Sequence, residues 1–259
     1  MAGSAQSVKS AIDALNSKYL DNAGAHNGIY RGKNLGTSVT AAQWAAIKAG
    51  TFEDLYIGDY WVINGVNWRI AAFDYYLNSG DTNTTAHHVV IVPDTNLHPA
   101  KMNSTNITTG AYLGSDFYTG NNDNTARADA ITKVNAAFGA AHILSHRVLL
   151  KNAVKDGYAS GYVWTDATVE LMSEKMVYGT QIYSGMPNGS VIPAQYTVDK
   201  TQLPLFALEP SRICNRAYWW LRSVVSSTYF AKVANNGAAD YNNASYSHGV
   251  RPVFAIYQS

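Results

Sequence analysis

Histidine, aspartate and cysteine are the residues through which this sequence could do chemistry. His142 and His146 are four residues apart, a spacing that on one helix would place both imidazoles on one face, as zinc sites require. Ser145 lies between them and has the character of a helix N-cap, so we expect the two histidines to lie on different elements. No acidic residue follows them in a metalloprotease pattern. We therefore expect no metal site there.

A second candidate is the segment 116–124, DFYTGNNDN, which offers the oxygen ligands that calcium prefers. It lacks the glycine position and the terminal glutamate of an EF-hand loop. Turn formation explains the same Asn, Asp and Gly residues without an ion. Bound calcium is the alternative interpretation, but we expect no cofactor.

Nucleophilic catalysis would have to use Cys214, the one cysteine. A single cysteine excludes an internal disulfide and a CxxC metal site, and no catalytic signature surrounds it. We expect it to be buried packing. The sequence also lacks a GxSxG elbow, a phosphate-binding loop and a dinucleotide fingerprint. We predict that the protein is not an enzyme.

Composition excludes further classes of function. Of 259 residues, 47% are hydrophobic and only 14% charged, with a net charge of +1 and no cluster of Lys or Arg. Counterion release on nucleic acid needs clustered cations, so we expect no nucleic-acid partner. No apolar run approaches 18 residues, which argues against membrane insertion. The first residues lack the apolar core of a signal peptide, so we expect synthesis in the bacterial cytoplasm.

The elements that must position any site begin with a short amphipathic helix over residues 5–15. It is too short to be stable alone, so it either packs on its own chain or associates with other copies. After a connector at 21–37, Thr40 and Gln43 form a capping box for a helix that ends at Gly50. Strands are predicted at 60–63, 66–73 and 88–93, the first two joined by an Asn-Gly turn.

The rest of the chain reads as helices followed by short strands. Helices are predicted from Thr125 to Phe138, from Ser145 to Gly157 and from Thr165 to Tyr178. Extended segments are predicted at 191–198, 203–208, 219–223, 229–233 and 250–257. This pattern indicates an α+β fold with short antiparallel strands and peripheral helices. We divide it into an N-terminal helical element, residues 1–50, and a binding domain, residues 51–259.

The most informative segment is 215–254, where large apolar residues alternate with small polar and aromatic ones. Strands would bury the apolar set, which includes Trp220, Phe230 and Phe254. Between 223 and 248 the only charged residues are Lys232 and Asp240. A Tyr-, Asn- and Ser-rich surface with little charge is typical of antibody paratopes. The predicted ligand-binding residues are Tyr218, Trp219, Ser223, Thr228, Lys232, Asn235, Asn236, Ala238, Asp240, Tyr241, Asn242, Asn243, Tyr246 and His248.

The motifs WLRSV, YFAKV and GVRPVF resemble the C-terminal signature of C-type-lectin-fold proteins of phages and prophages. Many such proteins are variable proteins of diversity-generating retroelements, in which adenines of asparagine codons are rewritten. The segments GDYWVINGVNWRIAAFDYYLN, HHVVIVPD, SHRVLLKNAV and TDATVELM are similar to the body of the same group, so the resemblance covers most of residues 25–257. Lys232 and Trp219 are not simple products of adenine substitution in an asparagine codon.

This resemblance implies a C-type-lectin-like fold of the formylglycine-generating-enzyme-like branch. It also implies a phage-encoded host-recognition module on the virion tail, with a diversifiable region at 215–254 and Arg222 and Arg251 as structural residues. The partner would be a bacterial surface protein or glycan. Separately, if the N-terminal helix self-associates, we expect a homotrimer. One alternative is a structural virion protein whose C-terminal face contacts another phage protein. A copper enzyme of the same branch would need a cysteine pair, which this sequence lacks.

Overall fold

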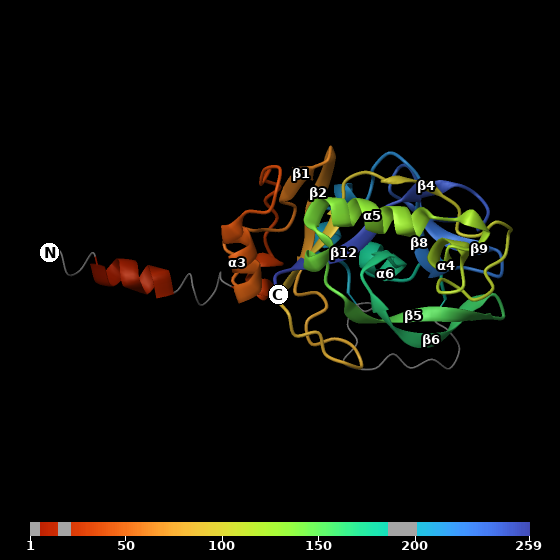
Figure 1. Cartoon of the computed structure of the whole chain (residues 1–259), viewed down its shortest axis with the longest axis horizontal. Helices are drawn as coiled ribbons and strands as arrows, with labels where there is room; N and C mark the ends of the chain where they lie inside the picture. Colours follow the sequence, from red (N-terminus) through yellow and green to blue (C-terminus); the bar gives the residue numbers. More distant parts are fainter. Residues whose placement is uncertain (1–5, 15–21, 186–200) are drawn as a thin grey trace.

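Two five-stranded sheets form the main body of the protein (Figure 1). The computed structural model describes residues 6–14, 22–185 and 201–259. The first sheet is antiparallel, and its strands in spatial order are β1 (Tyr60–Ile63), β2 (Val66–Phe73), β3 (His88–Pro93), β12 (Pro252–Tyr257) and β7 (Val169–Leu171). The C-terminal strand β12 therefore lies between strands from distant parts of the chain.

The second sheet carries most of the predicted binding segment. Its order is β10 (Ala239–Asn243), β9 (Tyr229–Val233), β8 (Trp219–Val224), β11 (His248–Val250) and β4 (His98–Ala100). Its pairs are antiparallel except β11 with β8, which is parallel and registers Gly249 with Trp219. The predicted strands at 219–223, 229–233 and 250–257 are confirmed, with a break at Arg251 in the last. Strand β10 was not predicted.

A two-stranded hairpin, β5 (His146–Lys155) and β6 (Tyr158–Ala167), replaces the helix predicted between Ser145 and Gly157. The Asp156–Gly157 pair joins the strands, with φ of 52° and 83°, a left-handed pair typical of a tight hairpin turn. The helix predicted from Thr165 is also wrong, because Thr165 pairs with Val148 inside this hairpin. Gly157 therefore belongs to the hairpin turn between β5 and β6 and does not end a helix.

Helices lie at the periphery of the sheets (Figure 1). They are α2 (Ala23–His26), α3 (Ala41–Ala49), α4 (Asp116–Thr119), α5 (Ala126–Phe138), α6 (Glu174–Tyr178) and α7 (Pro204–Leu208), with short 3-10 turns at 121–123, 140–142 and 210–212. The predicted helix at 125–138 is confirmed, and part of the predicted loop at 116–124 is helical. Pro204 begins α7 where we predicted an extended segment; the segment predicted at 191–198 lies outside the described residues.

Local sequence signals explain the elements that were predicted well. Thr40 and Gln43 form the expected capping box of α3, and Gly50 ends the helix in the left-handed conformation. Asn64 and Gly65, both with positive φ, form the tight turn between β1 and β2. The mixed α+β fold, with antiparallel sheets and peripheral helices, is therefore confirmed.

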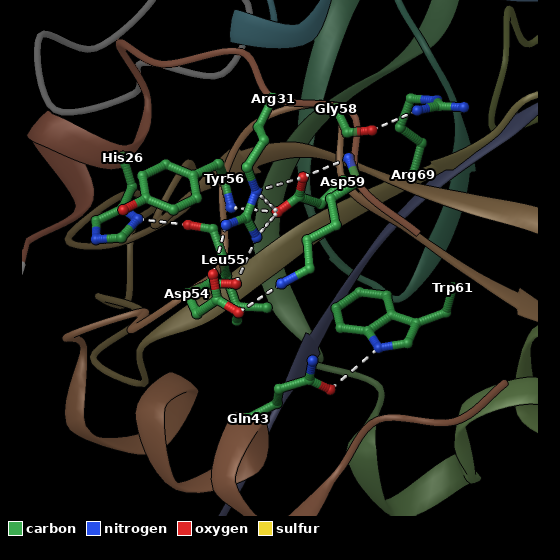
Figure 2. Close-up of polar contacts among 11 residues, drawn as sticks. His26, Arg31, Gln43, Asp54, Leu55, Tyr56, Gly58, Asp59, Trp61 and Arg69 are labelled. Carbon is green, nitrogen blue, oxygen red and sulfur yellow. Dashed lines mark hydrogen bonds and ion pairs between the residues drawn. The ribbon is translucent and has the colours of Figure 1, made fainter. Parts of the chain in front are cut away.

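The connector after α2 is fixed to the body by a buried carboxylate (Figure 2). Asp59 is fully buried and accepts hydrogen bonds from the Arg31 guanidinium and from the backbone N–H groups of Lys33 and Tyr56. Arg31 also binds the exposed Asp54. These bonds hold the connector against the loop that enters β1.

Residues 6–14 form a helix whose nine residues are all exposed. Val8 and Ile12 on this helix are 57% and 51% exposed. Packing of this helix on its own chain, one of our two expectations, is therefore wrong for the described residues. Self-association stays a prediction. None of the helices in the described residues has the length and the apolar run needed to cross a bilayer.

Candidate functional site

The predicted binding residues lie on the second sheet and its turns, at the end of the molecule away from α3 (Figure 1). Strand β8 lies in the middle of this sheet, and β10 is its edge. A central strand is covered on both faces by neighbouring elements, whereas an edge strand and the turns are open to solvent. The position of each strand therefore determines which predicted residues can reach a ligand.

Three predicted residues are buried and do not form part of the exposed surface. Trp219 is fully buried, and Ser223, 1% exposed, accepts a hydrogen bond from the backbone N–H of Glu174. Lys232 is 3% exposed. Alternation along β8 and β9 does not expose these side chains, because both faces of the strands are covered.

Five predicted residues form one connected cluster. The Lys232 ammonium lies 2.5 Å from a carboxylate oxygen of Asp240 and 4.0 Å from the ring centre of Tyr218. The ring of His248 lies 5.5 Å from that of Tyr218, and the Asn242 amide is 3.0 Å from His248 Nε2. Register explains this grouping, since Asp240 pairs with Lys232 across the β9–β10 ladder and Asn242 lies two residues further on.

The charges inside this cluster are balanced. Burial opposes ionisation of Asp240, but the hydrogen bond from Lys232 lowers the pKa of that carboxyl group. Burial and the Lys232 ammonium together lower the pKa of His248 to about 4. His248 is therefore neutral near pH 7. The Lys232–Asp240 pair is an internal support under Tyr218 rather than a free charge.

Tyr241 belongs to a separate aromatic group. Successive side chains on a strand point to opposite faces, so Tyr241 lies on the other face of β10 from Asp240 and Asn242. Its ring contacts Tyr229 at 5.2 Å and Tyr183 at 4.9 Å between ring centres. Tyr183 comes from the loop after α6, so sequence inspection of the C-terminal segment alone missed it. The predicted residues thus lie on both sides of the sheet edge.

The remaining predicted residues lie on turns or at strand ends. Asn235, Asn236 and Ala238 are exposed around the β9–β10 turn. Tyr246 is 53% exposed on the turn before β11, and Asn106 holds that turn by accepting hydrogen bonds from Ser245. The two half-buried positions that complete the predicted set are Thr228 and Asn243.

A shallow hollow of about 320 Å³ adjoins the Tyr218 cluster. The residues that line it are Asn96, His98, Pro99, Ala217, Tyr218, Ser247, His248 and Gly249. One wall thus comes from residues 96–99, which we did not predict. The Asn96 amide donates to the Tyr218 carbonyl at 3.1 Å and accepts from Asn215 at 2.8 Å. No motif in the sequence links these segments, which are more than 100 residues apart.

Two buried arginines support the sheet as the sequence predicted. Arg251, 1% exposed, donates to the backbone carbonyls of Pro93 and Ile213 and stacks over the Trp219 ring at 4.9 Å. Burial lowers the pKa of Arg251 to about 10. Arg222 donates to the Leu171 carbonyl. Both side chains serve the scaffold rather than the surface.

The other chemical candidates have structural partners. His142 lies in a 3-10 turn and His146 begins β5, so the two are on different elements, as predicted. The Asp116 carboxylate accepts hydrogen bonds from the backbone N–H of Ser104 and from the Asn122 amide. Cys214 is half-buried, which corrects the expectation of full burial. Within the described ranges, no group of three or more His, Cys, Asp or Glu side chains could hold a metal ion.

Comparison with known proteins gives one match. A family model described as a domain of unknown function, DUF6273, matches residues 171–258. This stretch runs from the last residue of β7 almost to the C-terminus and contains all fourteen predicted binding residues. Searches of curated proteins and of solved structures find no match to the chain.

Proposed function

We propose that this chain is a non-enzymatic receptor-binding protein, a phage-encoded host-recognition module on a C-type-lectin-like fold. The observation that carries the proposal is a set of three exposed tyrosines on the second sheet and its turns. Tyr218, Tyr241 and Tyr246 are 42%, 41% and 53% exposed and come from three different segments. Tyrosine offers a large, rigid contact area at a low entropic cost, and it is enriched at the centres of protein interfaces.

The support beneath these residues also favours recognition. Tyr218 rests on the buried Lys232, which is paired with the partly exposed Asp240, and Tyr241 packs on two other aromatic rings. A ring that is already fixed loses little freedom on binding, and such preorganisation improves affinity. The exposed neighbours Asn235, Asn236 and Ala238 lie on a turn, where substitutions usually change stability by about 0.5 kcal/mol or less. A diversifiable surface requires this tolerance.

The experiment compares the binding of fluorescently labelled protein to a panel of bacterial cells. Wild-type protein is expected to bind at least one strain. Each of the variants Tyr218→Ala, Tyr241→Ala and Tyr246→Ala should weaken this binding by about 30-fold, because a typical hot-spot residue contributes about 2 kcal/mol. Tyr158→Ala is the matched control, since Tyr158 is 49% exposed on the β5–β6 hairpin.

Urea unfolding of each variant separates binding from folding. The proposal requires unfolding midpoints near that of the wild type for the three site variants. It fails if no strain is bound, if the three variants bind as well as wild type, or if Tyr158→Ala loses binding to the same extent.

A further inference from the structure

The hollow beside Tyr218 combines hydrogen-bond donors with an absence of carboxylates. Its lining residues include two histidines, an asparagine, a serine and a tyrosine, and none of them is acidic. One wall, residues 96–99, belongs to the scaffold, and the opposite wall, residues 217–218 and 247–249, belongs to the predicted variable segment. If the scaffold wall stays constant while the other wall varies, the ligands of different variants should share the chemical group that contacts the scaffold wall.

Lys133 on α5 supplies a positive charge next to His98, one of the residues that line this hollow. His98 Nε2 lies 2.9 Å from the carbonyl of Ala126, so this nitrogen carries the proton and Nδ1 is an acceptor. The Lys133 ammonium lies 3.3 Å from His98 Nδ1 and donates to the Leu97 carbonyl at 2.8 Å. Two neutral acceptors thus hold the cation in place.

No carboxylate of the described residues forms an ion pair with Lys133. Asp129, one turn earlier on α5, accepts a hydrogen bond from the Thr125 hydroxyl instead. Burial, and then the Lys133 charge, lower the pKa of His98, while Asp129 acts in the opposite direction; Lys133 gives this wall a positive charge that no ion pair neutralises. A ligand that brings a negative charge would therefore be attracted to it.

His248 supplies a second directed donor. The Asn242 amide donates to His248 Nε2, so the neutral imidazole carries its proton on Nδ1. Among the described residues, no acceptor bonds this Nδ1–H group. The half-exposed Tyr218 ring beside it has the Lys232 ammonium at 4.0 Å, which fixes the ring in place.

We propose that this hollow binds the carboxylate and ring of an acidic sugar residue on the bacterial surface. The Lys133 ammonium and the His248 Nδ1–H would meet the carboxylate, and the Tyr218 ring would contact the apolar side of the sugar. A volume of about 320 Å³ suits one or two sugar rings and lies at the small end of ligand sites. This inference rests on the proposed recognition function and names the class of its ligand.

The test uses three small probes and nuclear magnetic resonance titration of the full chain. Galacturonate has both the ring and one carboxylate, galactose has the ring alone, and N-acetylglutamate has two carboxylates without the ring. Galacturonate is expected to shift the signals of Tyr218 and His248, to bind about tenfold more tightly than either other probe, and to raise the pKa of His248 from about 4. Added salt should weaken galacturonate binding but not that of galactose.

Lys133→Gln should reduce the affinity for galacturonate about fivefold and leave that for galactose unchanged. Lys155→Gln, which alters an exposed lysine on the β5–β6 hairpin, is the matched control and should change neither. Absence of galacturonate binding, or equal binding of galactose, would overturn the proposal. Equal binding of N-acetylglutamate would assign the hollow to an acidic peptide instead. If the probes fail while tyrosine-dependent cell binding persists, only the ligand class is wrong; if both fail, the recognition function is wrong as well.

Discussion

Replacing Gly249 with alanine should disturb the fold and the site together. Gly249 lies in β11 between β8 and β4, and its N–H donates to the Tyr218 carbonyl at 2.9 Å. An added Cβ would lie 1.9 Å from Asn96 Nδ2 and 2.7 Å from Asn96 Cβ, far inside van der Waals contact. The Asn96 side chain would have to move away, because β11 is paired on both sides.

The cost follows from the contacts that Asn96 would lose. Its two hydrogen bonds, with the Tyr218 carbonyl and with Asn215, are worth about 1 kcal/mol each. Overpacking of a well-packed site adds about 1–3 kcal/mol. We therefore expect Gly249→Ala to lower the free energy of unfolding by about 3 kcal/mol in urea titrations and to weaken cell binding.

A double-mutant cycle with Asn96→Gly tests the reasoning. Once the Asn96 side chain is absent, the extra methyl group of Gly249→Ala has room, so the double variant should be more stable than the sum of the single effects predicts, by about 2 kcal/mol. The outcome that would refute this account is strict additivity, or a Gly249→Ala variant as stable as wild type.

Two further predictions concern buried ionisable groups. Asp59→Asn should lower the free energy of unfolding by about 2–3 kcal/mol, because it weakens the buried carboxylate site that binds Arg31 (Figure 2). Asp54→Asn changes an exposed partner of the same arginine and should cost less than about 1 kcal/mol. Equal urea midpoints for the two variants would contradict this. Burial lowers the pKa of His146 to about 3, while an unfolded histidine titrates near 6.5. The unfolded state therefore binds more protons between these values, and this histidine should cost about 2 kcal/mol of stability on going from pH 7 to pH 5. A His146→Gln variant with an unchanged pH dependence would argue against this assignment.

Elements with strong local signals could be predicted from the sequence. The capping box of Thr40 and Gln43 and the Asn64–Gly65 turn each specify a local backbone geometry. The helix at 126–138 has buried residues at helical spacing, including Ala130 and Val134. In these segments, local propensity and tertiary packing agree.

The segment 145–178 shows where local reading fails. The run from Val148 to Leu150 is apolar at consecutive positions, a pattern that suits a buried strand and a helix alike. The deciding signal was the Asp156–Gly157 pair, which favours a hairpin turn over a helix end. Strand β10 was missed because its Asp and Asn residues have low strand propensity, and it forms through pairing with β9.

The binding surface could be predicted in composition but not in arrangement. Alternation cannot reveal that Trp219 and Ser223 lie on a central strand covered on both faces. Nor can it show that Asn96 and His98 form the opposite wall of the hollow, because these contacts arise only from the pairing of β4 with β11. Long-range strand order determines both facts.

The central claim is tested most directly by altering exposed side chains of this surface and measuring whether the binding specificity changes while the fold does not. A variant that combines Asn236→Tyr, Ala238→Ser and Tyr246→Asn alters only exposed side chains on turns. Our account predicts a different pattern of bound strains across the cell panel, with a free energy of unfolding within about 1 kcal/mol of wild type. An unchanged binding pattern in a folded variant would contradict the claim that this surface recognises the host.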